Sequence, residues 1–261
     1  MKKYISGLVT AIAAILFSAI SLNAQTKVVA HRGFWNCEAA GYSENSIASL
    51  KAAQDAGLWG SECDIQLTAD NVIIVNHDGS IKGKVIRKCN FTDFKDDLLP
   101  NGERRPSFDE YLTQCEKCPT TILVVEFKKQ ESVEAEDMLV DKAIETIKAH
   151  GLFSPDRVAF ISFSKHICQR IVTAAPGFIN QYLNGELSPK KLAALGINGF
   201  DYHFRTMKNH PAWIKQAAKY GLSTNTWTVN DKPTAKWMIK QGVGAITTNY
   251  PLMVKELLSD K

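Results

Sequence analysis

Four short polar groups, each at or near the end of an apolar run, contain the residues most suited to chemistry. They are His31–Gly33, Glu62–Asp64, His77–Asp78 and Glu126–Lys128. Together they supply two histidines, several carboxylates, an arginine and a lysine. This is the set of side chains needed to hold a divalent cation and cleave a phosphate ester.

Glu62, Asp64 and Glu126 form the candidate metal site. Glu62 and Asp64 are two residues apart, so in a strand both side chains point to the same face, while Cys63 points to the other face. Two buried carboxylates would repel each other and lose hydration unless a cation neutralised them. Glu126 ends another apolar run and could supply a third oxygen ligand. An all-carboxylate site suits Mg²⁺ or Ca²⁺ and not Zn²⁺.

His31 and His77 are the candidate acid and base. His31 follows an apolar run, and Gly33 just after it allows a turn and a close approach to a ligand. Asp78 stands beside His77 and could orient its imidazole. Two histidines on opposite sides of a phosphodiester could donate and accept the protons of its cleavage. Taken singly, each histidine is also compatible with a purely structural role.

Arg32 and Lys128 supply positive charge. An arginine can bind two non-bridging phosphate oxygens at once. Lys128 lies two residues after Glu126, which places it on the same face of that strand. The sequence therefore predicts a phosphate-binding position beside the acids.

Eight β-rich runs alternate with amphipathic runs along the chain, which predicts a single-domain α/β fold of the TIM-type (β/α)8 barrel class. The expected strands are Lys27–Ala30, Gly60–Gln66, Thr121–Phe127, Arg157–Phe163, Phe178–Leu183, Gly199–His203, Leu222–Val229 and Gly244–Thr247. The expected helices are Ser46–Ala56, Glu134–His150, Lys165–Ala174, Pro189–Leu195, Pro211–Tyr220, Lys232–Gln241 and Leu252–Ser259.

One region departs from this alternation. The apolar run Val72–Val75 closely follows the second strand and suggests an extra strand paired beside it. Gly79–Pro106 then carries three glycines, two prolines and many charges, which predicts an irregular insertion. Long insertions after early barrel strands can cover the site, and a surface loop without a role is the alternative.

Residues 1–24 resemble a secretory signal peptide. Lys2 and Lys3 form a positive start, Ile5–Leu22 is mostly apolar, and Ala24 offers a small residue at a cleavage point. Cleavage there would leave a barrel domain of residues 25–261, exported to the periplasm or secreted. Because the apolar stretch approaches the length of a membrane-spanning helix, a retained anchor is the alternative. After cleavage we expect no stable membrane insertion.

Charge and cysteine content limit the partners and the cross-links. Without residues 1–24 the chain has 29 basic and 27 acidic residues, a formal net charge of +2. This balance argues against nucleic acid or an anionic membrane as the main partner. Six cysteines remain, and only Cys115 and Cys118 are close in sequence. Two further zinc ligands at matching spacing are absent, so we expect free thiols or one local disulfide. The oligomeric state stays open.

In their order along the chain, these groups resemble the conserved segments of the glycerophosphodiester phosphodiesterase family. The matching segments are His31–Gly33, Glu44-Asn45, Glu62–Asp64, His77-Asp78, Val125–Lys128, Trp227–Asn230 and Gly244–Pro251. Each segment is short, but the ordered set spans nearly the whole mature chain.

The resemblance implies a barrel that uses a divalent metal, Mg²⁺ or Ca²⁺, to hydrolyse small glycerophosphodiesters to glycerol phosphate and an alcohol. It assigns the metal to Glu62, Asp64 and Glu126, and the acid and base roles to His31 and His77. The residues implied in substrate binding are Arg32, Glu44, Lys128 and Trp227. Trp227 would form an apolar wall, or it would simply fill the barrel.

The chain departs from the family pattern after His77-Asp78, where a leucine, an arginine and threonines are usual. Here Gly79–Gly83 has no arginine, and Ser46 replaces a commoner threonine. The departure leaves the alcohol of the substrate open. The rival functions are a phospholipase acting on intact lipid, a non-catalytic barrel that binds a phosphorylated ligand, and a glycosidase, which would leave both histidines and Lys128 without a role.

Overall fold

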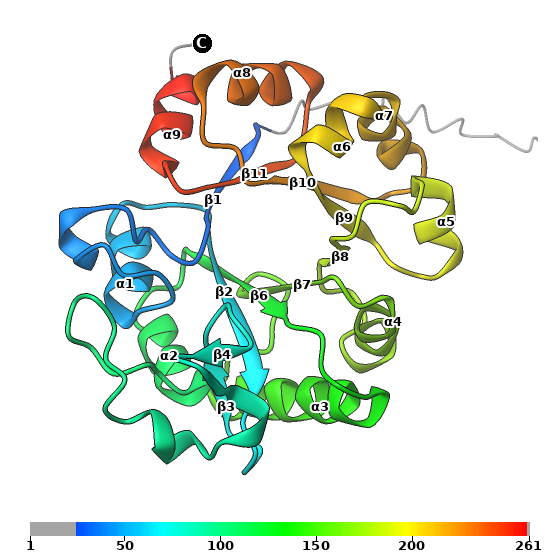
Figure 1. Ribbon diagram of the computed structural model, residues 1–261. Coiled ribbons are helices and arrows are strands. Elements are labelled where there is room, and N and C mark those ends of the chain that lie inside the picture. Colours follow the sequence, from blue (N-terminus) through cyan, green and yellow to red (C-terminus); the bar gives the residue numbers. More distant parts are fainter. Residues whose placement is uncertain (1–24, 260–261) are drawn as a thin grey trace, which may run out of the picture.

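Eight parallel strands form a nearly closed barrel, and helices surround it (Figure 1). The computed structural model describes residues 25–259. The barrel strands are β1 (Lys27–Ala30), β2 (Gly60–Leu67), β6 (Ile122–Phe127), β7 (Val158–Ser162), β8 (Asn180–Tyr182), β9 (Gly199–His203), β10 (Ser223–Trp227) and β11 (Ala245–Thr248). The predicted fold class and all eight predicted strands are confirmed, with ends shifted by at most two residues. The predicted signal peptide lies outside the described residues.

Neighbouring strands pair in the order β10-β9-β8-β7-β6-β2-β1-β11. The first and last strands in the sequence are therefore neighbours, with Lys27 opposite Ala245. Between β10 and β11 the contact is looser, because single bonds replace a continuous ladder. One joins the Val229 amide to the Thr247 carbonyl at 3.0 Å, and another joins the Gly244 amide to the Thr224 hydroxyl at 2.8 Å.

Helices follow the strands and pack on the outside of the barrel (Figure 1). They are α1 (Ile47–Asp55), α2 (Phe108–Glu116), α3 (Val133–Ala149), α4 (Lys165–Ala174), α5 (Pro189–Ala194), α6 (Phe204–Asn209), α7 (Ala212–Lys219), α8 (Lys232–Gln241) and α9 (Pro251–Ser259). Side chains cap several of them, as Ser46 does for α1 and Asp231 for α8. Helices α2 and α6 were not predicted, although Ser107 and Glu110 form a capping box at the start of α2.

Apolar side chains fill two layers. The inner layer, inside the barrel, includes Val29, Val124 and Ile161. The outer layer lies between strands and helices, and there Cys63 packs with Leu50 and Tyr111. The predicted outward orientation of Cys63 is therefore confirmed, and Glu62 and Asp64 on either side of it point into the barrel.

The predicted extra strand is β3 (Ile73–Val75), which pairs antiparallel with the C-terminal residues of β2, from Ile65 to Leu67. The insertion that follows contains the hairpin strands β4 (Ser80–Ile81) and β5 (Lys84–Val85) and two 3-10 turns, η2 (Ile86–Lys88) and η3 (Phe91–Phe94). Ile81, Ile86 and Phe94 pack with Ile74 into a small separate cluster. The insertion is thus an ordered unit attached beside β3.

The sequence left two possibilities for the six cysteines, free thiols or one local disulfide. In the structure all six are free thiols. Within residues 25–259, no helix combines the length and the apolar character needed to cross a bilayer.

Candidate active site

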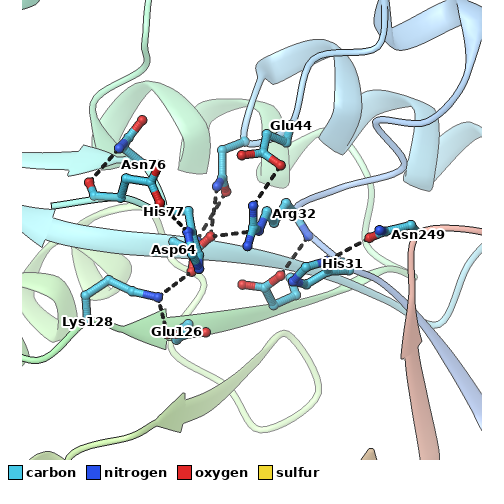
Figure 2. Close-up of polar contacts among 12 residues, drawn as sticks. His31, Arg32, Glu44, Asp64, Asn76, His77, Glu126, Lys128 and Asn249 are labelled. Carbon is cyan, nitrogen blue, oxygen red and sulfur yellow. Dashed lines mark hydrogen bonds and ion pairs between the residues drawn. The ribbon is translucent and has the colours of Figure 1, made fainter. Parts of the chain in front are cut away.

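Asp64 of β2 and Glu126 of β6, two of the predicted metal ligands, lie close together (Figure 2), and Glu62 of β2 joins them. In the parallel pairing of these strands Asp64 lies opposite Glu126, and Glu62 is one inward-facing position before Asp64. One oxygen from each of the three carboxylates lies within 4.8 Å of the others. All three residues are buried. The strand register, which the sequence does not state, therefore builds the cluster.

Neighbouring donors hold the acids in place. The Asn45 side chain donates to Asp64 Oδ2 at 2.8 Å, and the Arg32 amide donates to Glu62 Oε2 at 2.7 Å. Lys128 Nζ lies 2.7 Å from Glu126 Oε1 and 3.3 Å from Asp64 Oδ1. Glu62 Oε1 is buried and has no hydrogen-bond partner within the described residues. A buried carboxylate oxygen without a partner is costly, which fits a site that binds a cation there.

The electrostatics of the acids agree with this fit. Burial, and then the nearby Asp64 carboxylate, raise the pKa of Glu126 to about 7. The same two causes hold the pKa of Glu62 well above its usual range. The protein alone therefore destabilises the charged form of both groups, and a divalent cation would reverse that effect. The hard oxygen donors suit Mg²⁺ or Ca²⁺.

Arg32 is fixed by its backbone and its side chain. Its φ of 57° is left-handed, and its carbonyl accepts from the Asn45 amide at 2.9 Å. Its guanidinium donates to Glu44 at 2.8 Å and lies 3.8 Å from Asp64. Glu44, predicted to bind substrate, contacts Arg32 and is not among the residues that line the site cavity. Its visible effect is to orient the guanidinium.

The sequence suggested that Gly33 allows a close approach to a ligand. In the structure, glycine is needed at this position because of a close approach to Ser49. The φ of Gly33 is +79°, and a Cβ there would lie 2.2 Å from the Ser49 hydroxyl and 2.8 Å from the Ser49 backbone carbon. The close neighbour is therefore helix α1. Only glycine lets the loop after β1 lie this near to the helix.

His31 and His77 line the same cavity and are held differently. His31 Nδ1 is 2.7 Å from the Asn249 side-chain oxygen, and burial, followed by the charge of Arg32, lowers the pKa of His31 to about 4. The His77 side chain is 35% exposed, and its Nδ1 is 2.8 Å from Asp78 Oδ1 as expected. In both rings Nδ1 is engaged, which leaves Nε2 for a bound molecule.

Trp227 lines the opposite side of the cavity, which has a volume of about 140 Å³. Its indole donates to the Asp201 carbonyl at 3.0 Å, and the Trp227 and Phe163 rings pack in a T-shaped arrangement with 5.5 Å between centroids. This wall comes from the second half of the barrel. Residues 79–106 of the insertion contribute no side chain to the cavity lining.

A family model now supplies the deciding comparison. Residues 31–253 match the glycerophosphoryl diester phosphodiesterase family. The chain belongs to this family. It is a phosphodiesterase of the glycerophosphodiester class, as the sequence predicted.

Individual relatives agree with this placement. A glycerophosphodiester phosphodiesterase from Caldanaerobacter subterraneus subsp. tengcongensis is 27% identical over 241 residues, which cover 87% of this chain and 95% of that protein. A crystal structure of a glycerophosphodiester phosphodiesterase from Parabacteroides distasonis is 38% identical, with a TM-score of 0.87, and the match covers 90% of this chain and 98% of that one. A phosphodiesterase from Oleispira antarctica, solved with the product sn-glycerol-3-phosphate, is 22% identical with a TM-score of 0.76 and covers 91% of this chain and 98% of that one. At this identity the last match shows the shared fold.

Sequence reasoning missed three polar residues that shape the site of this phosphodiesterase. Gln66 donates to the Asn76 and Asp78 carbonyls at 2.7 Å and to the His77 carbonyl at 3.2 Å, and so fixes the turn that carries His77. Asn249 contacts His31, and Asp201 lines the cavity. A signal existed for Asp201, because an acid between Phe200 and Tyr202 in a buried strand is unusual.

Proposed function

We propose that this phosphodiesterase hydrolyses glycerophosphodiesters with His31 and His77 as the proton-transfer pair and a divalent cation held by Glu62, Asp64 and Glu126. The observation that carries the proposal is the joint placement of the two histidines and the buried acids around one cavity. When bound, Mg²⁺ or Ca²⁺ would supply positive charge to the phosphodiester oxygens. Arg32 and Lys128 would add to it.

The two histidines suit opposite roles in proton transfer. Burial and Arg32 keep the pKa of His31 low, so His31 is neutral at physiological pH and can take the proton of the attacking hydroxyl at Nε2. Asp78 beside Nδ1 of His77 orients that ring, and Nε2 of His77 is the atom that can donate a proton to the leaving alcohol oxygen. The attacking hydroxyl is either water or the neighbouring glycerol hydroxyl, and the latter would give a cyclic phosphate first.

The substrate class rests on the family and on the cavity. The Oleispira antarctica relative was solved with sn-glycerol-3-phosphate, and a cavity of about 140 Å³ suits a small polar group. Phosphodiesters of glycerol are therefore the proposed substrates. Intact phospholipid is the second candidate, because Phe163 in the cavity wall is 36% exposed and Tyr250 on a neighbouring loop is 48% exposed.

The test is hydrolysis of a panel that contains several glycerophosphodiesters and intact phospholipids. Each substrate is assayed in chelator, and again after addition of Mg²⁺ or Ca²⁺. We expect turnover of the water-soluble diesters only with metal, and release of sn-glycerol 3-phosphate. Turnover that persists in chelator would contradict the metal requirement, and a preference for intact phospholipid would contradict the substrate class. Trapping of a cyclic phosphate separates the two nucleophiles.

We also propose that residues 1–24 direct export to the periplasm or the medium and are then removed. The basic start, the apolar stretch and Ala24 support this proposal. Cell fractionation and N-terminal sequencing test it, with a mature N-terminus at Gln25 as the expected result. A full-length protein that stays in the membrane fraction would favour a retained anchor.

A further inference from the structure

The cavity between the two halves of the barrel has chemically different walls. The half formed by β1, β2, β6 and the turn after β3 carries the histidines, the acids and Arg32. The half formed by β7 to β11 is mainly apolar, with side chains of Ile161, Phe163, Leu183 and Trp227. Two threonines, Thr228 and Thr247, also line this half, and Asp201 is its one acid. The proposed chemistry of phosphate cleavage does not use this acid.

One carboxyl oxygen of Asp201 accepts a hydrogen bond, and the other has no hydrogen-bond partner within the described residues. It is 1% exposed, and the Asn225 amide donates to its Oδ2 at 3.1 Å. Two further hydrogen bonds fix the Asn225 side chain. Its Nδ2 also donates to the Thr247 hydroxyl at 2.9 Å, and its Oδ1 accepts from the backbone amide of Thr226 at 2.8 Å. Asp201 Oδ1 is buried and has no hydrogen-bond partner within the described residues.

An oxygen in this state lowers stability. A buried polar atom without a partner costs about 1–3 kcal/mol, and more when it is charged. An apolar residue at this position would complete the wall without that cost. The retained acid, fixed in orientation by Asn225, is therefore suited to a group that enters the cavity with the substrate.

We infer that Asp201 is a positioning residue that hydrogen-bonds the terminal hydroxyl of the substrate's glycerol unit, an inference that rests on the proposed function. The four apolar side chains suit the carbon chain of glycerol, and the acid supplies one polar contact among them. We assign the terminal hydroxyl to Asp201 because the central hydroxyl is next to the phosphate, which binds at the opposite wall with the acids.

A hydroxyl fits this position better than the ammonium group of an alcohol such as choline or ethanolamine. Asp201 offers a ligand the single oxygen Oδ1, because Oδ2 already accepts from the Asn225 side chain. One acceptor satisfies the single O–H donor of a hydroxyl, whereas the ammonium of ethanolamine has three N–H donors and the trimethylammonium of choline has none. The contact would hold the glycerol in one orientation during the reaction.

The test removes the two partners of the proposed contact in turn. Native protein and Asp201→Ala are compared on a glycerophosphodiester and on the matching diester of propane-1,2-diol, which lacks the terminal hydroxyl. We expect the native protein to prefer the glycerol diester by about 10–100-fold in kcat/KM. Asp201→Ala should hydrolyse both diesters with nearly equal kcat/KM. A variant that keeps the native preference would overturn the inference.

Two further variants control for effects on folding. Asp201→Asn keeps the shape of the side chain and its contact with Asn225, so an intermediate preference is expected even if the alanine variant folds poorly. Tyr202→Phe, on the same strand, removes an outward-facing hydroxyl that donates to the Leu187 carbonyl at 2.7 Å. This control should keep the full preference for the glycerol diester. Thermal melting curves confirm that each variant is folded.

A second comparison varies the leaving alcohol of the diester. It tests whether Asp201 contacts the glycerol half of the substrate or the leaving alcohol. If the loss in Asp201→Ala is the same for choline, ethanolamine and glycerol as leaving alcohols, Asp201 faces the glycerol half. A loss that depends on the alcohol would place Asp201 on the leaving-group side and overturn the inference while leaving the proposed function intact. Failure of the native protein to hydrolyse any of these diesters would overturn both.

Discussion

At the residue scale, the two histidines of the cavity differ in how they are held. The half-buried His31 ring contacts the Asn249 side chain, whereas the His77 ring is 35% exposed and pairs with the carboxylate of Asp78. This difference is the basis for assigning one as the proton acceptor and the other as the donor. Both assignments require that neither ring can be removed without loss of the reaction.

Replacing either histidine tests the proton-transfer roles. We expect His31→Ala and His77→Ala each to lower kcat by roughly 10²- to 10⁴-fold, the usual range for loss of an acid or a base. The matched control is His166→Ala, because His166 is on α4 and pairs with Asp137 at the surface. Steady-state kinetics at saturating metal provide the measurement. Turnover close to native in either site variant would contradict the assignment.

Glu126 allows a prediction about metal and pH. Its pKa is about 7 in the folded chain and about 4.5 in an unfolded one, so the folded state binds more protons between these values and stability falls as the pH rises through this window. In chelator, Glu126→Gln should therefore be more stable than the native chain at pH 8, by about 3 kcal/mol at 1.36 kcal/mol per pKa unit. At pH 4, where the carboxyl is neutral in both states, the difference should vanish.

Denaturant unfolding at the two pH values measures this difference. Adding Mg²⁺ or Ca²⁺ at pH 8 should remove the advantage of the variant, because the ion stabilises the native acids and not the glutamine. Equal stability of the two proteins in chelator at pH 8 would show that the folded state does not destabilise the charged form of Glu126.

At the element scale, the close packing of the loop after β1 against α1 sets the position of His31 and Arg32. A side chain at Gly33 would collide with Ser49 and would also need a left-handed φ. We expect Gly33→Ala to lower the free energy of unfolding by about 3 kcal/mol, the sum of an unfavourable φ and overpacking. Gly83→Ala is the control, since Gly83 has a φ of +83° but no atom near its added Cβ.

Urea unfolding separates the two costs. Gly83→Ala should lose only about 1–2 kcal/mol, the cost of the left-handed conformation alone. Equal losses for the two variants would mean that the contact with α1 is not what requires glycine at position 33.

The turn that carries His77 depends on Gln66 of strand β2. Its amide satisfies three carbonyls of that turn, so we expect Gln66→Met to lower kcat about 10-fold through misplacement of the ring. Gln114→Met is the matched control, because Gln114 is also buried but pairs with Gln54 between α1 and α2. Both variants should lose similar stability. A normal kcat for Gln66→Met would mean that β3 alone fixes the turn.

At the scale of the whole molecule, no covalent cross-link holds the barrel. The six cysteines of the chain are free, and Cys63 and Cys168 are fully buried. We therefore expect the same melting temperature with and without a reductant. Alkylation of the unfolded protein followed by mass spectrometry should find six modified thiols. Protection of Cys115 and Cys118 from alkylation, reversed by reductant, would show the local disulfide that the structure lacks.

Local patterns in the sequence were sufficient for most of the fold. Alternation of apolar strands and amphipathic helices predicted the barrel and its eight strands, because each period reflects which side chains are buried. Helix α6 escaped this reasoning because it follows β9 without an intervening turn. Helix α2 escaped because a charged, glycine-rich insertion precedes it, although its capping box was readable.

The sequence by itself determined the chemistry of one wall of the site. Short stretches of sequence show two carboxylates at i and i+2, a histidine after a strand and a basic residue near an acid. Because side chains alternate along a strand, residues two apart lie on the same face. Only the tertiary structure decided what lies opposite. Asp201, Leu183 and Trp227 come from distant strands, and barrel closure, which no local pattern encodes, brings them within reach of His31 and Glu126. The unpartnered oxygen of Asp201 is visible only once that closure is known.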